Sequence, residues 1–359
     1  MHISILTHGE NLFGRHYART FLKRGHEVTF LSLTPCDAGE PGVATRVVGP
    51  AGFVPNRDPS RAAYLKTVLP VRRAVRELRP DILFALYMSS AGVVACLSGH
   101  PHVVVSARGS DVVTHVSSAL WRGVFRWEGR RAALVHVVSA PLAETLEHRV
   151  GVAAEKLLVC PIGVDTERFA LVDPATRPAA GRILCTRAHA PVYDQATLVR
   201  AMARLRGCGI ACHVTFANAS FAEATRDLVR DAGVEGMATF LPGYRLDELP
   251  ALMAGADVYV SCSLSDGTSS SLLEAMSTGT FPVVSDIAAN RPWVEHGRSG
   301  YLFPPGDDAA LADRLAESLA DAGLRARAAP VCRDVVVRGG DVRRQMDTLL
   351  AAFEQCLNT

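Results

Sequence analysis

The sequence predicts an α/β protein made of two doubly wound, Rossmann-like domains, and three observations support this. Short runs rich in Val, Ile and Leu alternate with segments of helical spacing along the chain, as expected for strands covered on both faces by helices. The alternation starts again after residues 170–181, a stretch rich in Pro, Ala and Gly. A chain of 359 residues is also too long for one core and suits two domains of roughly 150–200 residues.

The opening of the chain predicts a strand, a loop, a helix and a second strand. Residues 2–6 are a β-type run, residues 7–13 carry loop residues, and residues 14–24 have the spacing of a helix that ends near Gly25. Residues 27–33 are the next β-rich run. In such a unit the first loop follows the carboxyl end of a parallel strand, where α/β proteins bind ligands.

The remaining elements follow the same pattern in both halves. In the first half, a helix is predicted at 68–78 and strands at 81–85, 102–106 and 133–138. In the second half, strands are predicted at 182–186, 213–216, 239–241, 258–261 and 282–285, with a helix that ends near residue 205 and a final helix at about 341–356. We therefore expect an N-terminal domain at 1–170 and a C-terminal domain at 171–340. The last helix, about 341–359, is able to pack back on the first domain.

Composition argues against one class of partner and indicates which residues an anion site would use. The net charge of +2 argues against nucleic acid as a partner, because nucleic-acid-binding domains usually carry a strong basic excess. Almost all of the positive charge is arginine, since lysine occurs only at Lys23, Lys66 and Lys156. Arginine forms planar, bidentate contacts with phosphate and carboxylate, so an anion site in this chain is expected to use arginine.

The cysteines and the N-terminus bear on the cellular compartment. Nine cysteines without a CxxC pair or metal-ligand spacing predict reduced thiols and no metal centre. The first ten residues lack the basic start and apolar stretch of a secretory signal. The apolar segment at 84–99 is interrupted by serines and glycine and is too short to span a bilayer. We therefore expect a cytoplasmic protein.

The segment at 261–274, SCSLSDGTSSSLLE, is the most informative for chemistry. A strand ends at Ser261, a loop of small polar residues follows, and a helix begins near Leu272. Backbone N–H groups at a helix start bind anions, and small side chains let a diphosphate approach them. Asp266 and Glu274 place two carboxylates at the same rim, where they accept hydrogen bonds from hydroxyls. The alternative is an ordinary helix N-cap with surface carboxylates.

This segment resembles the Glu-x7-Glu signature of glycosyltransferase family 4, whose members are retaining enzymes with the GT-B fold. The spacing is kept, but the first acid is Asp266 rather than Glu. Further similar segments occur in the family's order: RGHEV at 24–28, RPDIL at 79–83, PIGVDTERF at 161–169, LPGYRLDELPALMAGADVYVS at 241–261 and EHGRSGYLFPPGD at 295–307. The resemblance thus covers nearly the whole chain and implies two Rossmann-like domains that face each other across a cleft.

The resemblance implies a role for several residues in binding a nucleotide-diphosphate sugar. Asp266 corresponds to the acid that touches the donor sugar, Glu274 to the acid that holds the ribose, and Arg187 to the arginine that neutralises the diphosphate. Gly14 lies near the turn that approaches phosphate and acceptor, although it is equally a glycine that starts a helix. The expected donor-binding set is Gly14, Arg187, Tyr244, Arg245, Gly267, Thr268, Ser269, Ser270, Ser271, Leu272 and Glu274, with Tyr244 and Arg245 beside the base.

Besides Asp266, three positions depart from the family pattern: Val192, Arg108 and Pro292, where many relatives have an acid. The family usually has a lysine five residues after the arginine, and this chain has Val192 there. His189 or an arginine of the first domain is a possible substitute. ARGSDV at 107–112 resembles the family's HGxD element, with Arg108 in place of the histidine and Asp111 retained. Arg108 cannot act as a base because a guanidinium stays protonated. It remains a candidate catalytic residue that pairs with phosphate, or else a structural partner of Asp111.

The resemblance also implies the reaction. The diphosphate leaves from the face on which the acceptor attacks, and a diphosphate oxygen takes the proton of the acceptor hydroxyl. The configuration at the anomeric carbon is therefore retained. No metal or other cofactor is expected, because arginine and backbone amides neutralise the leaving group. The expected partners are a nucleotide sugar, UDP- or GDP-linked, and a small-molecule or glycan acceptor.

Two basic segments in the first half have two interpretations. Residues 57–79 contain seven Lys or Arg against two acids, and residues 119–131 place Trp121 and Phe125 beside a row of arginines. The pattern is compatible with contact to an anionic membrane or an acidic acceptor. It is equally the pattern of a solvated helix face whose aromatic side chains pack on the sheet, and we favour this second interpretation because both runs are short.

Two other functions stay open at this point. A GT-B-fold nucleotide-sugar epimerase uses the same donor without an acceptor. A non-catalytic nucleotide-sugar-binding protein keeps the donor site and loses the reaction, which is compatible with the substitutions at Asp266, Arg108 and Val192.

Overall fold

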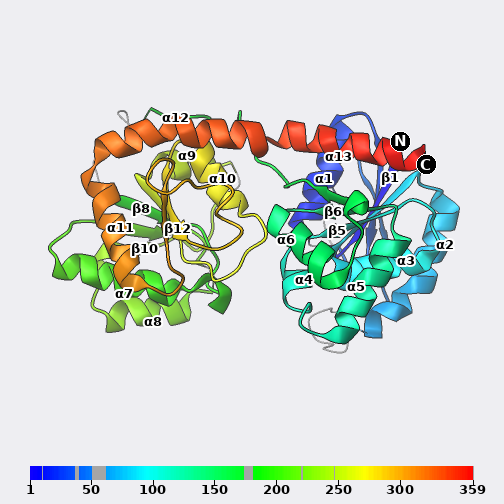
Figure 1. The fold of residues 1–359 in the computed structure, drawn as a ribbon, viewed down its shortest axis with the longest axis horizontal. Coiled ribbons are helices and arrows are strands. Elements are labelled where there is room, and N and C mark those ends of the chain that lie inside the picture. The colour runs from blue at the N-terminus through cyan, green and yellow to red at the C-terminus, as the bar shows by residue number, and fades with distance from the viewer. Residues whose placement is uncertain are drawn as a thin grey trace. The chain divides into compact units, whose positions relative to one another are not determined.

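A computed structural model describes residues 1–9, 11–36, 40–50, 62–173, 181–219, 221–245 and 247–358. Its contacts divide the chain into two compact units (Figure 1). The first unit contains Met1–Pro161 and Gln345–Thr359, and the second contains Ile162–Arg344. Most of the linker predicted at 170–181, namely residues 174–180, lies outside the described residues.

The first unit is built on a parallel sheet. Its described strands are β1 (His2–Thr7), β2 (Glu27–Ser32), β3 (Ala44–Val47), β4 (Ile82–Leu86), β5 (Val103–Ala107), β6 (Leu134–Val137) and β7 (Leu157–Val159). They lie in the order β3-β2-β1-β4-β5-β6-β7, and every pair is parallel. The direction in which strands are added therefore reverses between β1 and β4. In open α/β sheets, ligands bind beyond the carboxyl ends of the two strands at such a switch point.

Helices connect these strands. Among the described residues they are α1 (Leu12–Lys23), α2 (Val68–Leu78), α3 (Val93–Ser98), α4 (Ser110–Val113), α5 (Ala119–Arg131) and α6 (Ala140–Glu144). Shorter turns are the 3-10 helices η2 (Ala62–Thr67) and η5 (Ala154–Lys156) and the π-helices η3 (Tyr87–Gly92) and η4 (Thr145–Val150). The last helix of the chain, α13 (Val342–Leu357), belongs to this unit from residue 345 onward.

Both faces of the first sheet are buried, because successive residues of a strand point to opposite faces. On one face, the ring of Phe84 lies 6.3 Å from that of Phe21 in α1 and 5.4 Å from that of Phe353 in α13. On the other face, Leu83 and Ala85 of the same strand join the core under α2, α3 and α5. The strands accordingly have nearly continuous apolar sequences, which is why they are predictable from the sequence.

The second unit repeats this plan. Its described strands are β8 (Arg182–Cys185), β9 (His213–Phe216), β10 (Ala238–Phe240), β11 (Val258–Ser261), β12 (Phe281–Ser285) and β13 (Tyr301–Phe303). They lie parallel in the order β10-β9-β8-β11-β12-β13. The helices around them are α7 (Gln195–Gly207), α8 (Glu223–Asp231), α9 (Leu249–Ala254), α10 (Ser270–Ser277), α11 (Asp308–Ala320) and α12 (Ala322–Gly339), with 3-10 turns η7 (Pro191–Tyr193) and η8 (Glu235–Met237). The switch point here lies between β8 and β11.

The first boundary differs from the one that the sequence suggests. Residues 162–170 were expected at the end of the first domain, but hydrogen bonds attach them to the second unit. The amide of Val164 donates to the carbonyl of Gly340 over 2.7 Å. The carbonyl of Phe169 accepts hydrogen bonds of 2.6 Å from both Arg333 and Ser277. Contacts between residues this distant in sequence leave no signal in composition or periodicity, so composition places the boundary too late.

Three strands of the structure are absent from the sequence expectation: β3, β7 and β13. All three lie at the edge of a sheet and have only three or four residues. Most of their residues are exposed or half-buried, so they lack the apolar run that marks a central strand. Helix α1 also begins earlier than expected, because Asn11 caps it and its side chain accepts a hydrogen bond from the amide of Gly14.

Glu128 is an unusual feature of the first core. It lies on α5 with no exposed surface, and within the described ranges neither carboxylate oxygen has a hydrogen-bond partner. Burial, and the nearby charge of Asp111, raise the pKa of Glu128 well above its ordinary value. The folded chain therefore holds this proton at a pH where the unfolded chain releases it, and ionisation of Glu128 opposes folding.

We predict that Glu128→Gln removes a loss of stability that develops as the pH rises. The unfolded glutamate ionises near 4.5, so above that pH the wild type loses about 1.4 kcal/mol per pH unit relative to the variant until Glu128 ionises in the folded state. Thermal unfolding of both proteins between pH 5 and 9 measures the difference. Glu155→Gln, a change at an exposed position, is the matched control, and parallel stability curves for wild type and Glu128→Gln would contradict the prediction.

Candidate functional site

One cluster of predicted residues lies at the switch point of the second unit. Helix α10 follows β11 through the loop at 262–269, and Ser269 is its N-cap, with Oγ 3.3 Å from the amide nitrogen of Leu272. Asp266 lies in the loop and accepts a 2.8 Å hydrogen bond from the amide of Gly267. Gly267 is buried and Thr268 half-buried in the same loop. The start of α10 and its preceding loop thus form one polar rim beyond the strand.

Arg187 completes this rim from the neighbouring strand. It follows β8, and its guanidinium donates to Oδ2 of Asp266 over 2.7 Å. It also lies 3.1 Å from Oγ of Ser269 and 3.4 Å from Oγ of Ser271. Only 12% of the Arg187 side chain is exposed. The structure therefore brings together the cation and the carboxylate that the sequence singled out from segments about 80 residues apart.

The first turn of α10 has a limited number of open amides. The side chain of Leu272 is buried in the core and its amide is occupied by the Ser269 cap. Ser270 and Ser271 precede it, and amides in the first turn of a helix have no intrahelical acceptor. These two amides are therefore the better candidates for binding an anion. The hydroxyl of Ser271 also bonds the phenol of Tyr259 over 2.9 Å.

Tyr193 is a residue of this cluster that the sequence argument missed. Its ring lies 4.1 Å from the guanidinium carbon of Arg187, within the range of a cation–π contact. Tyr193 is the neighbour of Val192, the position where the family usually has lysine. The aromatic residue next to Val192 could have been recognised in the sequence as a partner of Arg187, because an aromatic ring holds a guanidinium in place.

His189, one of the expected substitutes for that lysine, is hydrogen-bonded within the second unit. Its Nδ1 lies 2.7 Å from Oγ1 of Thr225, and its ring packs near Phe216 and Phe240. Burial lowers the pKa of His189 below its ordinary value of 6.5, so the imidazole is neutral at pH 7. Val192 itself is apolar and 39% exposed.

Glu274 lies on α10, one turn beyond Ser270. Burial raises its pKa to about 7, and the charge of Arg168 opposes this shift. Burial, followed by the charge of Glu274, also raises the pKa of Tyr244, so Tyr244 and Glu274 lie within electrostatic range of each other. The adjacent Arg245 is exposed and forms a bidentate pair with Asp247, with two contacts of 3.0 Å.

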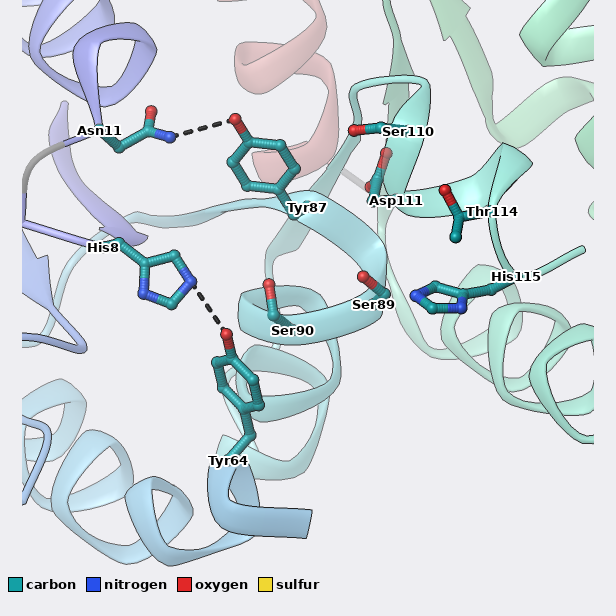
Figure 2. Close-up of a pocket in the computed structure, with 10 residues that line it drawn as sticks. All are labelled: His8, Asn11, Tyr64, Tyr87, Ser89, Ser90, Ser110, Asp111, Thr114 and His115. Atoms are coloured by element: carbon teal, nitrogen blue, oxygen red, sulfur yellow. Dashed lines mark hydrogen bonds between the residues drawn. The ribbon is translucent and has the colours of Figure 1, made fainter. Parts of the chain in front are cut away.

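The first unit has a polar pocket at its own switch point (Figure 2). It has a volume of about 300 Å³. Its described lining residues are His8, Asn11, Tyr64, Tyr87, Ser89, Ser90, Ser110, Asp111, Thr114 and His115. His8 follows β1, Tyr87 follows β4, and Ser110 and Asp111 follow β5. The pocket therefore lies at the carboxyl ends of these strands, as the topology requires.

Two hydrogen bonds link lining residues of this pocket in pairs, as Figure 2 shows. The amide nitrogen of the Asn11 side chain donates to the hydroxyl of Tyr87 over 3.1 Å. The hydroxyl of Tyr64 lies 3.0 Å from Nε2 of His8. On a third side, the ring of His115 stacks on that of Trp121 at 4.8 Å. Sequence reasoning missed most of this pocket, because its residues come from four separate segments with no shared motif.

In the altered HGxD element, Asp111 lines this pocket and Arg108 lies beside it, but the two do not pair through their side chains. Oδ1 of Asp111 accepts 3.0 Å hydrogen bonds from the amides of Arg108 and Gly109, and Oδ2 accepts one of 2.7 Å from Met88. Asp111 therefore orients the backbone of Arg108. The guanidinium lies 4.3 Å above the ring of Phe13 and 3.2 Å from the hydroxyl of Tyr17.

Gly14 has a packing role in the structure. It is the third residue of α1 and buried, and an added Cβ would lie 2.8 Å from Cγ2 of Thr7 and 2.9 Å from the ring of Phe30. Glycine is therefore needed for α1 to approach the sheet.

The described parts of the two basic segments, residues 62–79 and 119–131, are mainly helical and lie in the first unit. Arg57, Asp58 and Arg61 lie outside the described residues. In the segment at 119–131, which is α5, Phe125 is buried and Trp121 packs 5.5 Å from it. None of the helices in the described ranges is both long and apolar enough to cross a membrane. In the same ranges, no three His, Cys, Asp or Glu side chains gather in a way that could hold a metal ion.

Solved structures with the same architecture define the class of fold. The chain matches sucrose-phosphate synthase from Thermosynechococcus elongatus with a TM-score of 0.85 and 18% identity, over 99% of this chain and 98% of that one. It matches Anabaena HepE in complex with UDP with a TM-score of 0.78 and 18% identity, over 99% and 100% of the two chains. The two parallel sheets of seven and six described strands therefore belong to the GT-B fold.

Family models match both halves of the chain. Residues 13–168 match the model described as Glycosyltransferase Family 4, and residues 181–321 match Glycosyl transferases group 1. These two ranges include most of both units. The sequence segments that resemble the family lie within them or beside them. The chain belongs to glycosyltransferase family 4.

Several relatives of this chain are named as mannosyltransferases. The chain is 30% identical over 245 residues to the GDP-mannose-dependent alpha-(1-6)-phosphatidylinositol monomannoside mannosyltransferase of Mycobacterium tuberculosis, and the match covers 63% of each chain. It is 26% identical over 350 residues to the MMP alpha-(1->4)-mannosyltransferase of Mycolicibacterium hassiacum, over 83% of each. The match therefore spans a little under two thirds of the first relative's length.

We predict that Asp266→Asn strengthens the binding of a diphosphate at this cluster. The substitution removes the negative charge that pairs with Arg187 and keeps an oxygen for the amide of Gly267. Affinity for inorganic pyrophosphate is expected to rise about threefold to tenfold, and titration calorimetry measures it.

Two further variants give this experiment its controls. Arg187→Gln should abolish measurable pyrophosphate binding, because it removes the cation. Asp334→Asn also frees an arginine, Arg338, from an ion pair in the same unit, and should have no effect. An unchanged affinity in Asp266→Asn would show that Arg187 is not the diphosphate ligand.

Proposed function

We propose that this chain is a retaining glycosyltransferase that moves a hexosyl group from a nucleotide-diphosphate sugar to an acceptor hydroxyl. The observation that supports this most strongly is the position of Arg187. It lies at the switch point of the second sheet, beside the first turn of α10, and contacts Asp266, Ser269 and Ser271. A cation, open amides and hydroxyl acceptors in one rim match the chemistry of a sugar diphosphate.

In this proposal the donor is bound by groups of opposite character. The diphosphate takes the guanidinium of Arg187 and the amides of Ser270 and Ser271, which are charge-assisted or dipolar donors. Asp266 accepts hydrogen bonds from the sugar hydroxyls, and Glu274 accepts them from the ribose. The base lies near Tyr244 and Arg245, and Gly267 and Thr268 give the loop the small volume that close approach of the donor requires.

The reaction breaks the bond between the anomeric carbon and the diphosphate oxygen and forms a bond from the same carbon to the acceptor oxygen. The acceptor proton passes to a diphosphate oxygen, so charge and atoms balance without a protein base. Arg187 stabilises the negative charge that develops on the leaving group. Arg108 is proposed as a second positive charge for this step, because it cannot act as a base. In this mechanism protein groups supply the positive charge, and no metal or other cofactor takes part.

The nucleotide is proposed to be GDP or UDP. The mycobacterial relative's name specifies GDP-mannose, and solved structures of similar fold were obtained with UDP or UDP-glucose. A mannosyl donor linked to GDP is the first choice, since the relative shares 30% identity with this chain and the solved structures share 20% or less.

The first test is a melting-temperature panel with GDP, UDP, ADP and TDP. A ligand that binds only the native state stabilises it by about 2.7 kcal/mol at a hundred times its dissociation constant, and a chain of 359 residues that unfolds as one unit should then melt roughly 4 °C higher. We expect GDP or UDP to give this shift and Arg187→Gln to lose it.

The second stage of this test separates a transferase from its alternatives. With the matching nucleotide sugar, a transferase releases nucleotide faster when an acceptor is added and keeps the anomeric configuration, as the product's NMR spectrum shows. An epimerase changes the donor without an acceptor, and a binding protein leaves it intact. The absence of a shift with every nucleotide would overturn the proposal.

We also predict that affinity for the nucleotide sugar rises with pH between 6 and 8. Glu274 has a pKa of about 7 because it is buried, and ribose hydroxyls donate to its ionised form. Binding therefore lowers this pKa, and the bound state loses affinity as the pH falls through 7, by about tenfold per unit at most. Calorimetry with GDP-mannose or UDP-glucose measures the effect, since a diphosphate diester does not itself titrate in this range.

The variant Glu274→Gln is the control for that dependence. It keeps a hydrogen-bond acceptor at the same position but has no proton to lose. Its affinity should be lower at pH 8 and nearly constant from pH 6 to 8. If wild type and Glu274→Gln show the same pH profile, Glu274 does not bind the ribose in its ionised form.

A further inference from the structure

The side chain of Asn11 has a fixed orientation. Asn11 is the N-cap of α1, and its Oδ1 accepts a 2.8 Å hydrogen bond from the amide of Gly14. A flipped amide would place its NH2 group against that N–H, with two donors facing each other. The NH2 group therefore points to the other side, where it donates to the hydroxyl of Tyr87 over 3.1 Å. The N-cap of α1 therefore determines that the NH2 group of Asn11, and not its oxygen, faces the hydroxyl of Tyr87.

This orientation determines the hydrogen-bonding role of Tyr87. A phenol hydroxyl has one proton to donate and also accepts hydrogen bonds. Because Asn11 offers only a donor on this side, Tyr87 must accept from it and keeps its own proton. Within the described part of the chain no acceptor takes that proton, and the hydroxyl lies in the wall of the pocket (Figure 2). Tyr87 is therefore poised to donate to a ligand.

The backbone at Tyr87 supports a functional role. Its φ angle is 76°, in the left-handed region that bulky residues rarely adopt. It directly follows β4 and begins the π-helix η3, and irregular turns of this kind occur frequently at functional sites. The positive φ angle thus occurs at the residue whose side chain lines the pocket. No residue of the preceding strand β4 has a positive φ angle.

The charge of the pocket limits what it accepts. Its described lining residues include neither lysine nor arginine. The one carboxylate, Asp111, is buried, and both of its oxygens accept hydrogen bonds from backbone amides. An anionic group in this space would face the carboxylate of Asp111. No lysine or arginine stands among the described lining residues, because the guanidinium of the neighbouring Arg108 lies against Phe13 and Tyr17. Serine, threonine and tyrosine hydroxyls, by contrast, suit a ligand that has hydroxyls of its own. The volume of about 300 Å³ lies at the lower end for small-molecule sites.

We infer that the pocket of the first unit binds the acceptor as an uncharged polyhydroxyl group, such as an unphosphorylated sugar or polyol, and that Tyr87, set by Asn11, is its specificity-determining hydrogen-bond donor. That the ligand of this pocket is the acceptor rests on the proposed function. It adds the class of acceptor and a residue pair outside the family motifs. Tyr87 selects a ligand oxygen at a defined position in the pocket, and a described lining without lysine or arginine disfavours phosphorylated acceptors.

The test uses three variants of the full chain. Tyr87→Phe removes the hydroxyl. Asn11→Asp keeps an N-cap of equal quality but presents a carboxylate to Tyr87, which then donates its proton to residue 11 instead of the ligand. Asn11→Ser also keeps the cap, but its side chain is too short to reach Tyr87 and leaves the phenol proton available. Asn11→Ser is therefore the matched control for Asn11→Asp.

The probes are methyl α-D-mannopyranoside, methyl α-D-glucopyranoside and myo-inositol, each compared with a phosphorylated counterpart. Binding is measured by saturation-transfer NMR titration in wild type and in an Arg187→Gln background, where phosphates do not register at the second unit. We expect at least one neutral probe to bind, and its phosphate to bind at least about tenfold more weakly. Tyr87→Phe and Asn11→Asp should each weaken the neutral probe about tenfold, the effect of losing one good hydrogen bond.

The pattern across the variants decides the inference. Asn11→Ser should bind like wild type, and Asn11→Asp combined with Tyr87→Phe should be no weaker than Tyr87→Phe alone, because both changes remove the same hydrogen bond. Equal binding by Asn11→Asp and Asn11→Ser would overturn the role of Tyr87. Tighter binding of a phosphorylated probe, or no binding of any neutral probe, would overturn the class of acceptor.

Failure here and failure of the proposed function have different signatures. A chain that binds nucleotide and transfers sugar, yet shows no dependence on Tyr87, keeps the transferase proposal and loses this inference. A chain that binds neutral sugars through Tyr87 but binds no nucleotide loses the transferase proposal and keeps a carbohydrate site in the first unit.

Discussion

The reversal of strand order in each sheet is the constraint on which the rest of the structure depends. In a parallel sheet the connecting helices cover the faces, and at the point of reversal two adjacent loops diverge to opposite faces. This leaves an opening beyond the carboxyl ends of β1 and β4 in the first unit and of β8 and β11 in the second. Both candidate sites lie at these openings: the polar pocket with Tyr87 in the first, and the rim with Arg187 in the second. Position in the sheet thus accounts for residues that no local motif connects.

The rim in the second unit has one cation, Arg187, where the family usually has an arginine and a lysine. Arg187 contacts a carboxylate, two hydroxyls and the ring of Tyr193, so its planar guanidinium has little freedom. A cation held in this way loses less entropy on binding a diphosphate than a flexible lysine does. The ion pair with Asp266 has a second consequence. The carboxylate proposed to hold the sugar also offsets the charge of Arg187 while the site is empty, which couples recognition of the sugar to that of the diphosphate.

The pocket in the first unit follows a different principle. Its polarity comes from groups whose directions are set by backbone contacts: Asn11 through the cap of α1, and the carboxylate of Asp111 through three amides. Such groups select a ligand by the direction of its hydrogen bonds rather than by its charge. The change from histidine to Arg108 in the neighbouring element fits this division, because the guanidinium lies against Phe13 and Tyr17 and is not among the lining residues.

The sequence was sufficient for features that depend on local pattern. Buried parallel strands have continuous apolar runs, so the central strands were predictable, while the short, half-exposed edge strands β3, β7 and β13 were not. The spacing of Asp266, Glu274 and the small residues between them was likewise visible, because one loop and one helix carry them. Only the tertiary structure decided the features that depend on distant segments. These are the attachment of residues 162–170 to the second unit, the contact between Arg187 and Tyr193, the hydrogen bond between His189 and Thr225, and the pairing of Asn11 with Tyr87 across 76 residues. The reason is physical: hydrogen bonds, ring contacts and burial act through space, and periodicity in a sequence records only which face of an element is covered.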